Sequence, residues 1–112
     1  MRVVLTKRRG ESVADPEQGD FVGALEELLV DDPEHPDCWL ENENGWVISV
    51  FSSGLVLLEG PRCEDGVCHI PAIPRKEILR LWQLLREGKL DEIRRSHWVP
   101  GRPLCDLWHR PQ

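Results

Sequence analysis

Long apolar runs are missing from this chain of 112 residues. A helix that spans a membrane needs about 18 or more consecutive apolar residues, so the sequence predicts no membrane span. The N-terminal residues, MRVVLTKRRG, carry their charge after a short apolar stretch, which is not the order of a secretory signal peptide. Without an export signal, the four cysteines are expected to be reduced thiols rather than disulfides. We therefore expect a cytoplasmic protein.

Complete catalytic motifs are also missing. The sequence contains no G-x-S-x-G nucleophile turn, no glycine-rich phosphate loop and no H-E-x-x-H zinc-protease pattern. Its many carboxylates fall on predicted loops and outer helix faces, where they are expected to be solvated. The sequence therefore predicts a protein that is not an enzyme and needs no cofactor. The alternative is a cysteine-dependent enzyme in which Cys105 and His109 form the reactive pair.

Basic residues are scarce in the first 70 positions, which contain 15 acidic and 5 basic residues, whereas residues 71–112 contain 5 acidic and 9 basic ones. The net charge of −6 disfavours nucleic-acid binding, because phosphate contacts need a basic face. An acidic surface suits a basic protein partner instead, since opposite potentials speed association. The alternative is that the asymmetry only keeps the surface solvated. The residues expected to bind the partner are Asp31, Asp32, Glu34, Asp37, Glu41 and Glu43.

The first four of these acids lie in the segment DDPEHPD, residues 31–37. Two prolines stiffen this loop, and stiffness reduces the ordering cost of binding. Its spacing does not match the twelve-residue calcium loop with a central glycine. The segment therefore predicts either a plain helix-to-strand connector or a recognition loop beside the sheet.

Tyrosine is absent, whereas tryptophan occurs five times. Trp39 and Trp46 belong to a stretch, residues 38–59, that is rich in strand-favouring residues and predicts a three-stranded meander. Residues 44–45 (Asn-Gly) predict a two-residue type I′ turn, and residues 52–54 (Ser-Ser-Gly) predict a second turn. We expect both tryptophans to lie in the core.

Apolar residues at helical spacing predict two main helices. The first covers about residues 20–30, with Asp20 as its cap and Leu29 on its buried face. The second covers about residues 75–87. The polar stretch 7–19 predicts an exposed loop whose basic residues lie in solvent.

The expected fold class is therefore α+β, in a single domain over residues 1–112. It combines a four- or five-stranded, mostly antiparallel sheet with two helices packed on one face. Residues 96–112 contain tryptophan and proline and predict a C-terminal strap. Trp98 and Trp108 in this strap either anchor it to the body or present an interface.

One local cluster, Cys63, Cys68 and His69, has the residue types of a zinc site. Its spacing departs from the usual pairs of zinc ligands, and neighbouring residues on a strand point to opposite faces. We therefore expect no metal, and keep a small zinc-stabilised binding module as an alternative. A disulfide between the two cysteines is a further alternative.

The phrases ENGWVISVFSSGLVLLE and PRKEILRLWQLLREGKLDEI are similar to those of small bacterial α+β proteins. In layout the chain resembles immunity proteins encoded beside bacterial polymorphic toxins. That resemblance implies a compact, acidic, non-enzymatic inhibitor that covers the active site of a toxin in the cytoplasm. The partner would be a basic toxin domain, and the inhibitor would be a monomer or a weak homodimer.

Overall fold

The computed structural model describes residues 2–61, 66–96 and 98–101. The predictions made for Cys63, Cys105, Trp108 and His109 lie outside the described residues, as does most of the predicted strap.

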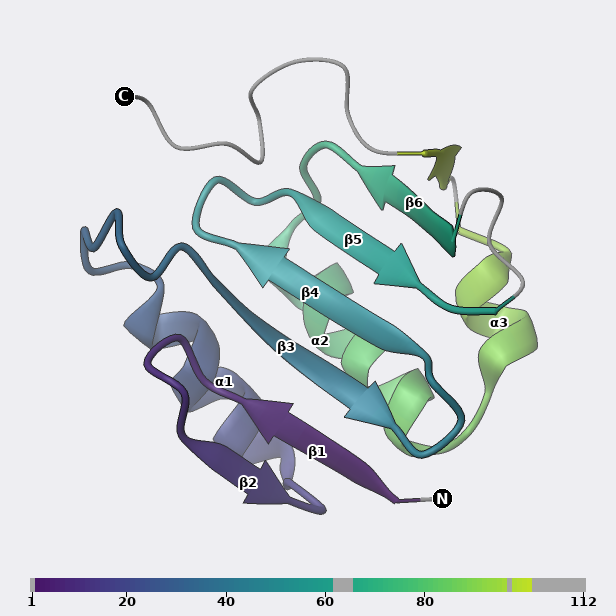
Figure 1. Cartoon of the computed structure of the whole chain (residues 1–112), viewed down its shortest axis with the longest axis horizontal. Coiled ribbons are helices and arrows are strands. Elements are labelled where there is room, and N and C mark those ends of the chain that lie inside the picture. Colours follow the sequence, from purple (N-terminus) through teal and green to yellow (C-terminus); the bar gives the residue numbers. More distant parts are fainter. Residues whose placement is uncertain (1, 62–65, 97, 102–112) are drawn as a thin grey trace.

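A seven-stranded sheet forms one layer of the molecule (Figure 1). Its strands lie in the order β2-β1-β3-β4-β5-β6-β7, and all neighbours are antiparallel. The α+β class with an antiparallel sheet is confirmed, but the predicted number of four or five strands is wrong. The strands are β1 (Val3–Thr6), β2 (Ser12–Ala14), β3 (Asp37–Asn42), β4 (Val47–Phe51), β5 (Val56–Glu59), β6 (Val67–Ile70) and β7 (Val99–Pro100).

The two strands that the sequence did not predict, β2 and β7, are the shortest. They have three and two residues, too few for an alternating pattern to stand out. β2 forms because a tight turn follows β1: the backbone N–H of Lys7 donates to Glu11 O at 2.7 Å, and that of Gly10 donates to Lys7 O at 2.9 Å. The exposed loop predicted over residues 7–19 is therefore wrong, because it contains one strand of a hairpin.

Three hairpin turns of the sheet share one construction, a three-residue loop that ends in a left-handed glycine. These glycines are Gly10, Gly45 and Gly54, with φ of +93°, +88° and +94°. The type I′ turn predicted for residues 44–45 is therefore wrong. The side-chain oxygen of Asn42 accepts hydrogen bonds from the backbone N–H groups of Asn44 and Trp46, both at 3.0 Å, and these bonds stabilise the longer loop.

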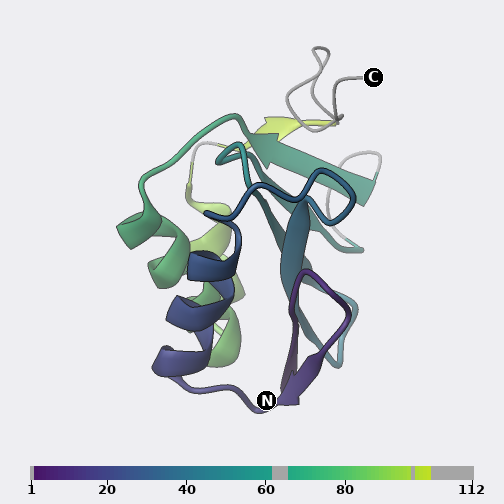
Figure 2. The same cartoon turned by 90° about the vertical axis from the view of Figure 1, so that its left-hand side faces the viewer.

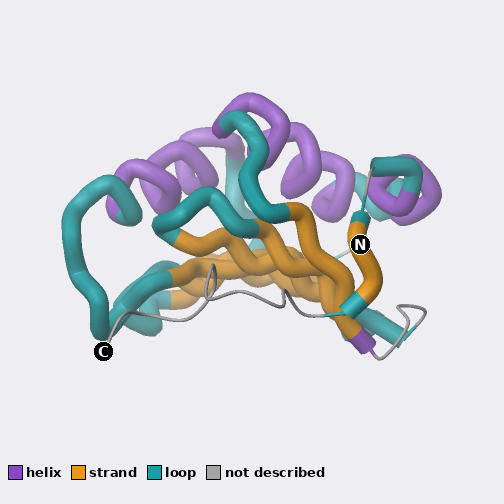
Figure 3. Tube along the Cα trace, turned by 90° about the horizontal axis from the view of Figure 1, so that it is seen from above, coloured by secondary structure: helices purple, strands orange, loops and turns teal. Residues whose placement is uncertain are grey.

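Three helices cover one face of the sheet (Figures 2 and 3), which confirms the expected packing of the two main helices on one face. They are α1 (Gln18–Glu27), α2 (Arg75–Arg86) and α3 (Leu90–Arg94). Trp82 of α2 is fully buried between the layers, and its indole N–H donates to the backbone oxygen of Ile48 at 3.1 Å. Its ring lies 5.4 Å from that of Phe21 in α1. The core therefore lies between α1, α2 and the middle of the sheet.

α1 begins and ends earlier than predicted. The N-cap is Glu17, whose backbone N–H donates to the carboxylate of Asp20 at 2.8 Å, so Asp20 supports the cap from inside the helix. After Glu27 the chain tightens, and the N–H of Val30 donates to Glu27 O at 3.2 Å. Leu29, predicted on the buried face, is consequently 78 % exposed.

Candidate docking surface

A buried arginine holds the acidic loop, residues 28–36, which connects α1 to β3. Arg8 lies in the turn between β1 and β2 and is only 7 % exposed, although it was predicted to be solvated. Its guanidinium donates to four backbone oxygens: those of Glu27, Val30 (2.7 Å), Asp32 (3.2 Å) and His35 (2.9 Å). Carbonyl groups at a helix end have no partner within the helix. Arg8 therefore satisfies the end of α1 and fixes the path of the loop.

Asp32, one of the predicted partner-binding acids, takes part in the loop's own ion pairs. Its Oδ2 lies 3.0 Å from Nδ1 of His35 and 3.1 Å from Nη2 of Arg9. The hydrogen bond with His35, and then that with Arg9, lowers the pKa of this carboxyl below its usual 3.8. Asp32 therefore stays ionised at neutral pH, and Arg9 of the turn between β1 and β2 balances its charge.

Five residues of the acidic loop are exposed: Leu29, Val30, Asp31, Pro33 and Glu34. Leu29 and Val30 are 78 % and 62 % exposed, more than any other large apolar side chain in the described ranges. The carboxylates of Asp31, which follows Val30 in the chain, and of Glu34 are exposed as well. A cleft of about 490 Å³ lies between this loop and Ser52, the residue that follows β4. An exposed apolar pair rimmed by charge is typical of a protein-binding surface.

The other three predicted acids lie in β3 or in the turn directly after it. Asp37 begins the strand and is half-buried, which raises the pKa of its carboxyl. Glu41 is exposed near the other end, about 13 Å farther along at the usual rise per residue. Glu43, in the turn beyond, accepts a hydrogen bond from the backbone N–H of Arg2 at 3.5 Å. The structure thus divides the six acids into a loop group and a β3 group, which adjoin at Asp37.

Cys38 is protonated and shielded from solvent. It lies on the side of β3 that packs against the helices and is fully buried. Burial, with smaller contributions from the charges of Asp37 and Glu27, raises the pKa of its thiol to about 12. The thiolate is the reactive form of cysteine, so this side chain is a poor nucleophile.

We expect Cys38 in the folded full-length chain to resist alkylation by iodoacetamide at about pH 8, where roughly one thiol in ten thousand would be ionised. In concentrated guanidinium chloride it should react at the rate of an ordinary thiol. Peptide mass mapping of the alkylated chain measures both rates. Rapid labelling of Cys38 under native conditions would contradict the burial described above.

Cys68 and His69, two residues of the alternative zinc site, lie on opposite faces of the sheet. Cys68 belongs to the core, and its Sγ lies 3.7 Å from the backbone oxygen of Leu58. On the other face, Nδ1 of His69 lies 2.7 Å from the backbone oxygen of Gly101. The two side chains therefore cannot bind the same ion. Across residues 2–61, 66–96 and 98–101, no three potential metal ligands lie together.

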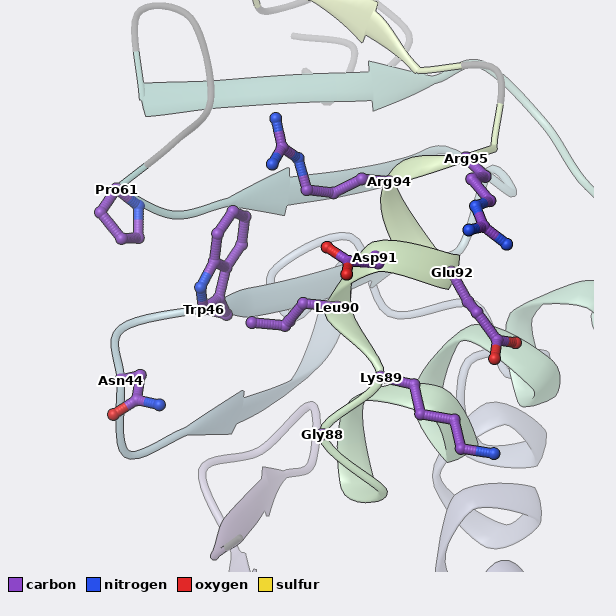
Figure 4. A pocket seen from close by; sticks show the side chains of 10 residues that line it. All are labelled: Asn44, Trp46, Pro61, Gly88, Lys89, Leu90, Asp91, Glu92, Arg94 and Arg95. Atoms are coloured by element: carbon purple, nitrogen blue, oxygen red, sulfur yellow. The ribbon is translucent and has the colours of Figure 1, made fainter.

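A second cleft, of about 620 Å³, lies between α3 and the start of β4 (Figure 4). Leu90 and Asp91 extend from α3 toward Trp46, which packs so closely on Gly60 that a Cβ there would lie 2.2 Å from its ring. The charged side chains of the α3 wall are all exposed: Asp91, Glu92, Arg94 and Arg95. Small-molecule sites usually orient their ligand with a few well-placed polar groups in an apolar pocket. This cleft is therefore the weaker candidate site.

Three residues that shape the docking surface, Arg8, Leu29 and Val30, were not predicted from the sequence. Arg8 belongs to a short basic run, and such runs are usually solvated. Leu29 continues the helical spacing of α1, so its pattern indicated burial. The one available signal was Asp31-Asp32-Pro33, which marks a helix end close to these apolar residues.

No family model, curated protein or solved structure matches this chain. None of the helices described is long and apolar enough to cross a membrane.

Proposed function

We propose that this chain is a non-enzymatic protein-binding module, an inhibitor of the immunity type, that docks a basic protein partner in the cytoplasm. One observation carries the proposal: the exposed pair Leu29 and Val30 and the exposed carboxylates of Asp31 and Glu34 belong to one loop, which Arg8 holds in place. The proposed partner is a basic domain such as a toxin. The module acts as a monomer or a weak homodimer.

The construction of the acidic loop supports this proposal. The hydrogen bonds of Arg8 and the ion pairs of Asp32 order the loop before any partner arrives, so less conformational entropy is lost on binding. Burial of the apolar pair adds to the affinity of an interface, and the acids around it steer a basic partner toward it. The charge and the apolar pair therefore have separate roles.

The first test is co-expression with the product of the neighbouring gene. We expect the two proteins to co-purify as a stoichiometric complex and this chain to relieve any toxicity of its neighbour. If a toxic neighbour neither binds this chain nor loses its toxicity when the two are co-expressed, the immunity-type function is wrong.

Neutralising the exposed loop acids in the double variant Asp31→Asn, Glu34→Gln should slow association with that partner by about tenfold at low salt. The difference should shrink as salt screens the charges, and the dissociation rate should change little. Surface plasmon resonance at several salt concentrations measures both rates. The matched control is Asp91→Asn, Glu92→Gln, which removes the same charge from α3. Equal slowing in both double variants would show that net charge alone guides association.

A further inference from the structure

The face of the sheet turned away from the helices has a tryptophan at its centre. In β3 the alternation of side chains directs Cys38 and Leu40 toward the helices and Asp37, Trp39 and Glu41 to the opposite face. Trp39 was predicted to be a core residue, but it is half-buried and lies on the helix-free face. β3 therefore presents an acid, an indole and a second acid in a line.

The neighbours of Trp39 across the sheet are small. Its partners in the register are Thr6 of β1 and Ser49 of β4, both buried. The next row carries Val4, Glu41 and Val47 side by side. The indole is therefore the largest side chain over the middle of β1, β3 and β4, and it is only partly buried.

The charged residues at the described strand positions of this face all have one sign. The strand residues that point to this face include Asp37, Glu41 and Glu59. In the described strands, no lysine or arginine points to it. Val47 of β4 is paired with Glu41 of β3 on one side and with Glu59 of β5 on the other. The basic residues of α2 lie on the other layer: Arg75, Lys76, Arg80 and Arg86. A cation approaching the helix-free face therefore meets attraction from three carboxylates.

We propose that the helix-free face binds an arginine side chain of the same basic protein partner, with its guanidinium stacked on the indole of Trp39 and flanked by Asp37 and Glu41. Guanidinium groups stack on tryptophan and pair with carboxylates, and this face supplies both. The inference rests on the proposed function for the identity of the partner. The acidic loop leads directly into this face: Asp37 follows Pro36, whose backbone oxygen accepts a hydrogen bond from the N–H of Ser52 at 2.8 Å.

A capped peptide of alternating glycine and arginine is the probe, added to the ¹⁵N-labelled full-length chain. We expect the indole N–H resonance of Trp39 to shift with a saturable dependence on peptide concentration. A peptide with citrulline in place of arginine has the same shape without the charge and should bind at least fivefold more weakly. The four other tryptophans serve as internal references.

Variants separate this site from general attraction to an acidic protein. Asp37→Asn with Glu41→Gln should weaken binding of the arginine peptide about fivefold, whereas the α3 double variant Asp91→Asn, Glu92→Gln should leave it within twofold. Equal binding of the citrulline peptide, an unmoved Trp39 resonance or equal effects of the two double variants would overturn the inference. A Trp39 shift that depends on protein concentration without peptide would assign the face to a second copy of the chain and would also overturn it.

The two proposals can fail separately. If Trp39→Leu leaves partner affinity unchanged while the loop variant Asp31→Asn, Glu34→Gln slows association, the proposed function stands and the arginine site is wrong. If the arginine peptide binds at Trp39 but the neighbouring gene's product is not captured, the site stands and the immunity-type function is wrong.

Discussion

Replacing Arg8 by methionine is expected to lower the free energy of unfolding by about 3 kcal/mol or more. Methionine keeps much of the apolar stem but removes donors to four backbone oxygens at the end of α1 and in the acidic loop. Two of these oxygens, on Glu27 and Asp32, also accept from the backbone N–H groups of Val30 and His35. Those oxygens lie where water has limited access, since Arg8 itself is 7 % exposed. Urea denaturation of the full-length variant measures the loss.

The matched control is Arg9→Met, one position along the same turn. The side chain of Arg9 is 64 % exposed and pairs only with Asp32 among the described residues, so its loss should cost about 1 kcal/mol at most. Hydrogen exchange should quicken across residues 28–36 in the Arg8 variant and hardly change in the Arg9 variant. Similar losses of stability in the two variants would show that the hydrogen bonds of Arg8 are not what holds the loop.

Arg8→Lys separates charge from geometry. Lysine keeps the positive charge, but a single ammonium cannot reach four oxygens that are spread over a helix end and a loop. We therefore expect this variant to resemble Arg8→Met more closely than the native chain. A near-native stability would indicate that a positive charge near the C-terminus of α1 is sufficient.

The parts of the fold that were predicted from the sequence have strong local patterns. The apolar stretch of β3 to β5, interrupted by two glycine-containing turns, specifies the meander, and the spacing of Ile78, Leu81, Trp82 and Leu85 specifies α2. In both cases the residues that form the element are close in sequence. Local spacing therefore carries enough information to place these elements.

The features that were missed depend on contacts between distant residues. α1 ends at Glu27, although its apolar spacing continues to Leu29, and the distant Arg8 binds the backbone oxygen of this last helical residue. Alternation in β3 puts Trp39 with Asp37 and Glu41 on one face, but it does not say which face the helices cover. The two acids that share its face were the available signal that Trp39 is not a core residue. Predicting the docking surface required knowing which residues meet across the fold.

Trp82→Ala is the second change with a large expected effect, a loss of about 3–5 kcal/mol in the free energy of unfolding. The substitution leaves a cavity between α1, α2 and the sheet, because Trp82 is fully buried and its ring packs on Phe21. It also removes the donor that the indole supplies to the backbone oxygen of Ile48. A loss of this size threatens folding of so small a domain, so the stability should be measured at low temperature by urea titration.

Trp82→Phe should still fold, and it separates the contribution of ring packing from that of the indole hydrogen bond. Phenylalanine retains most of the ring contact but leaves Ile48 O without the indole donor, so we expect a loss of about 1–2 kcal/mol. Trp39→Ala is the matched comparison on the other face, where a half-buried indole contributes less, about 1 kcal/mol. Trp82→Ala should lose more stability than Trp39→Ala because the helices cover the face on which Trp82 packs and not the face that carries Trp39. If Trp39→Ala were the more destabilising of the two, Trp39 would be a core residue and its role in docking would be excluded.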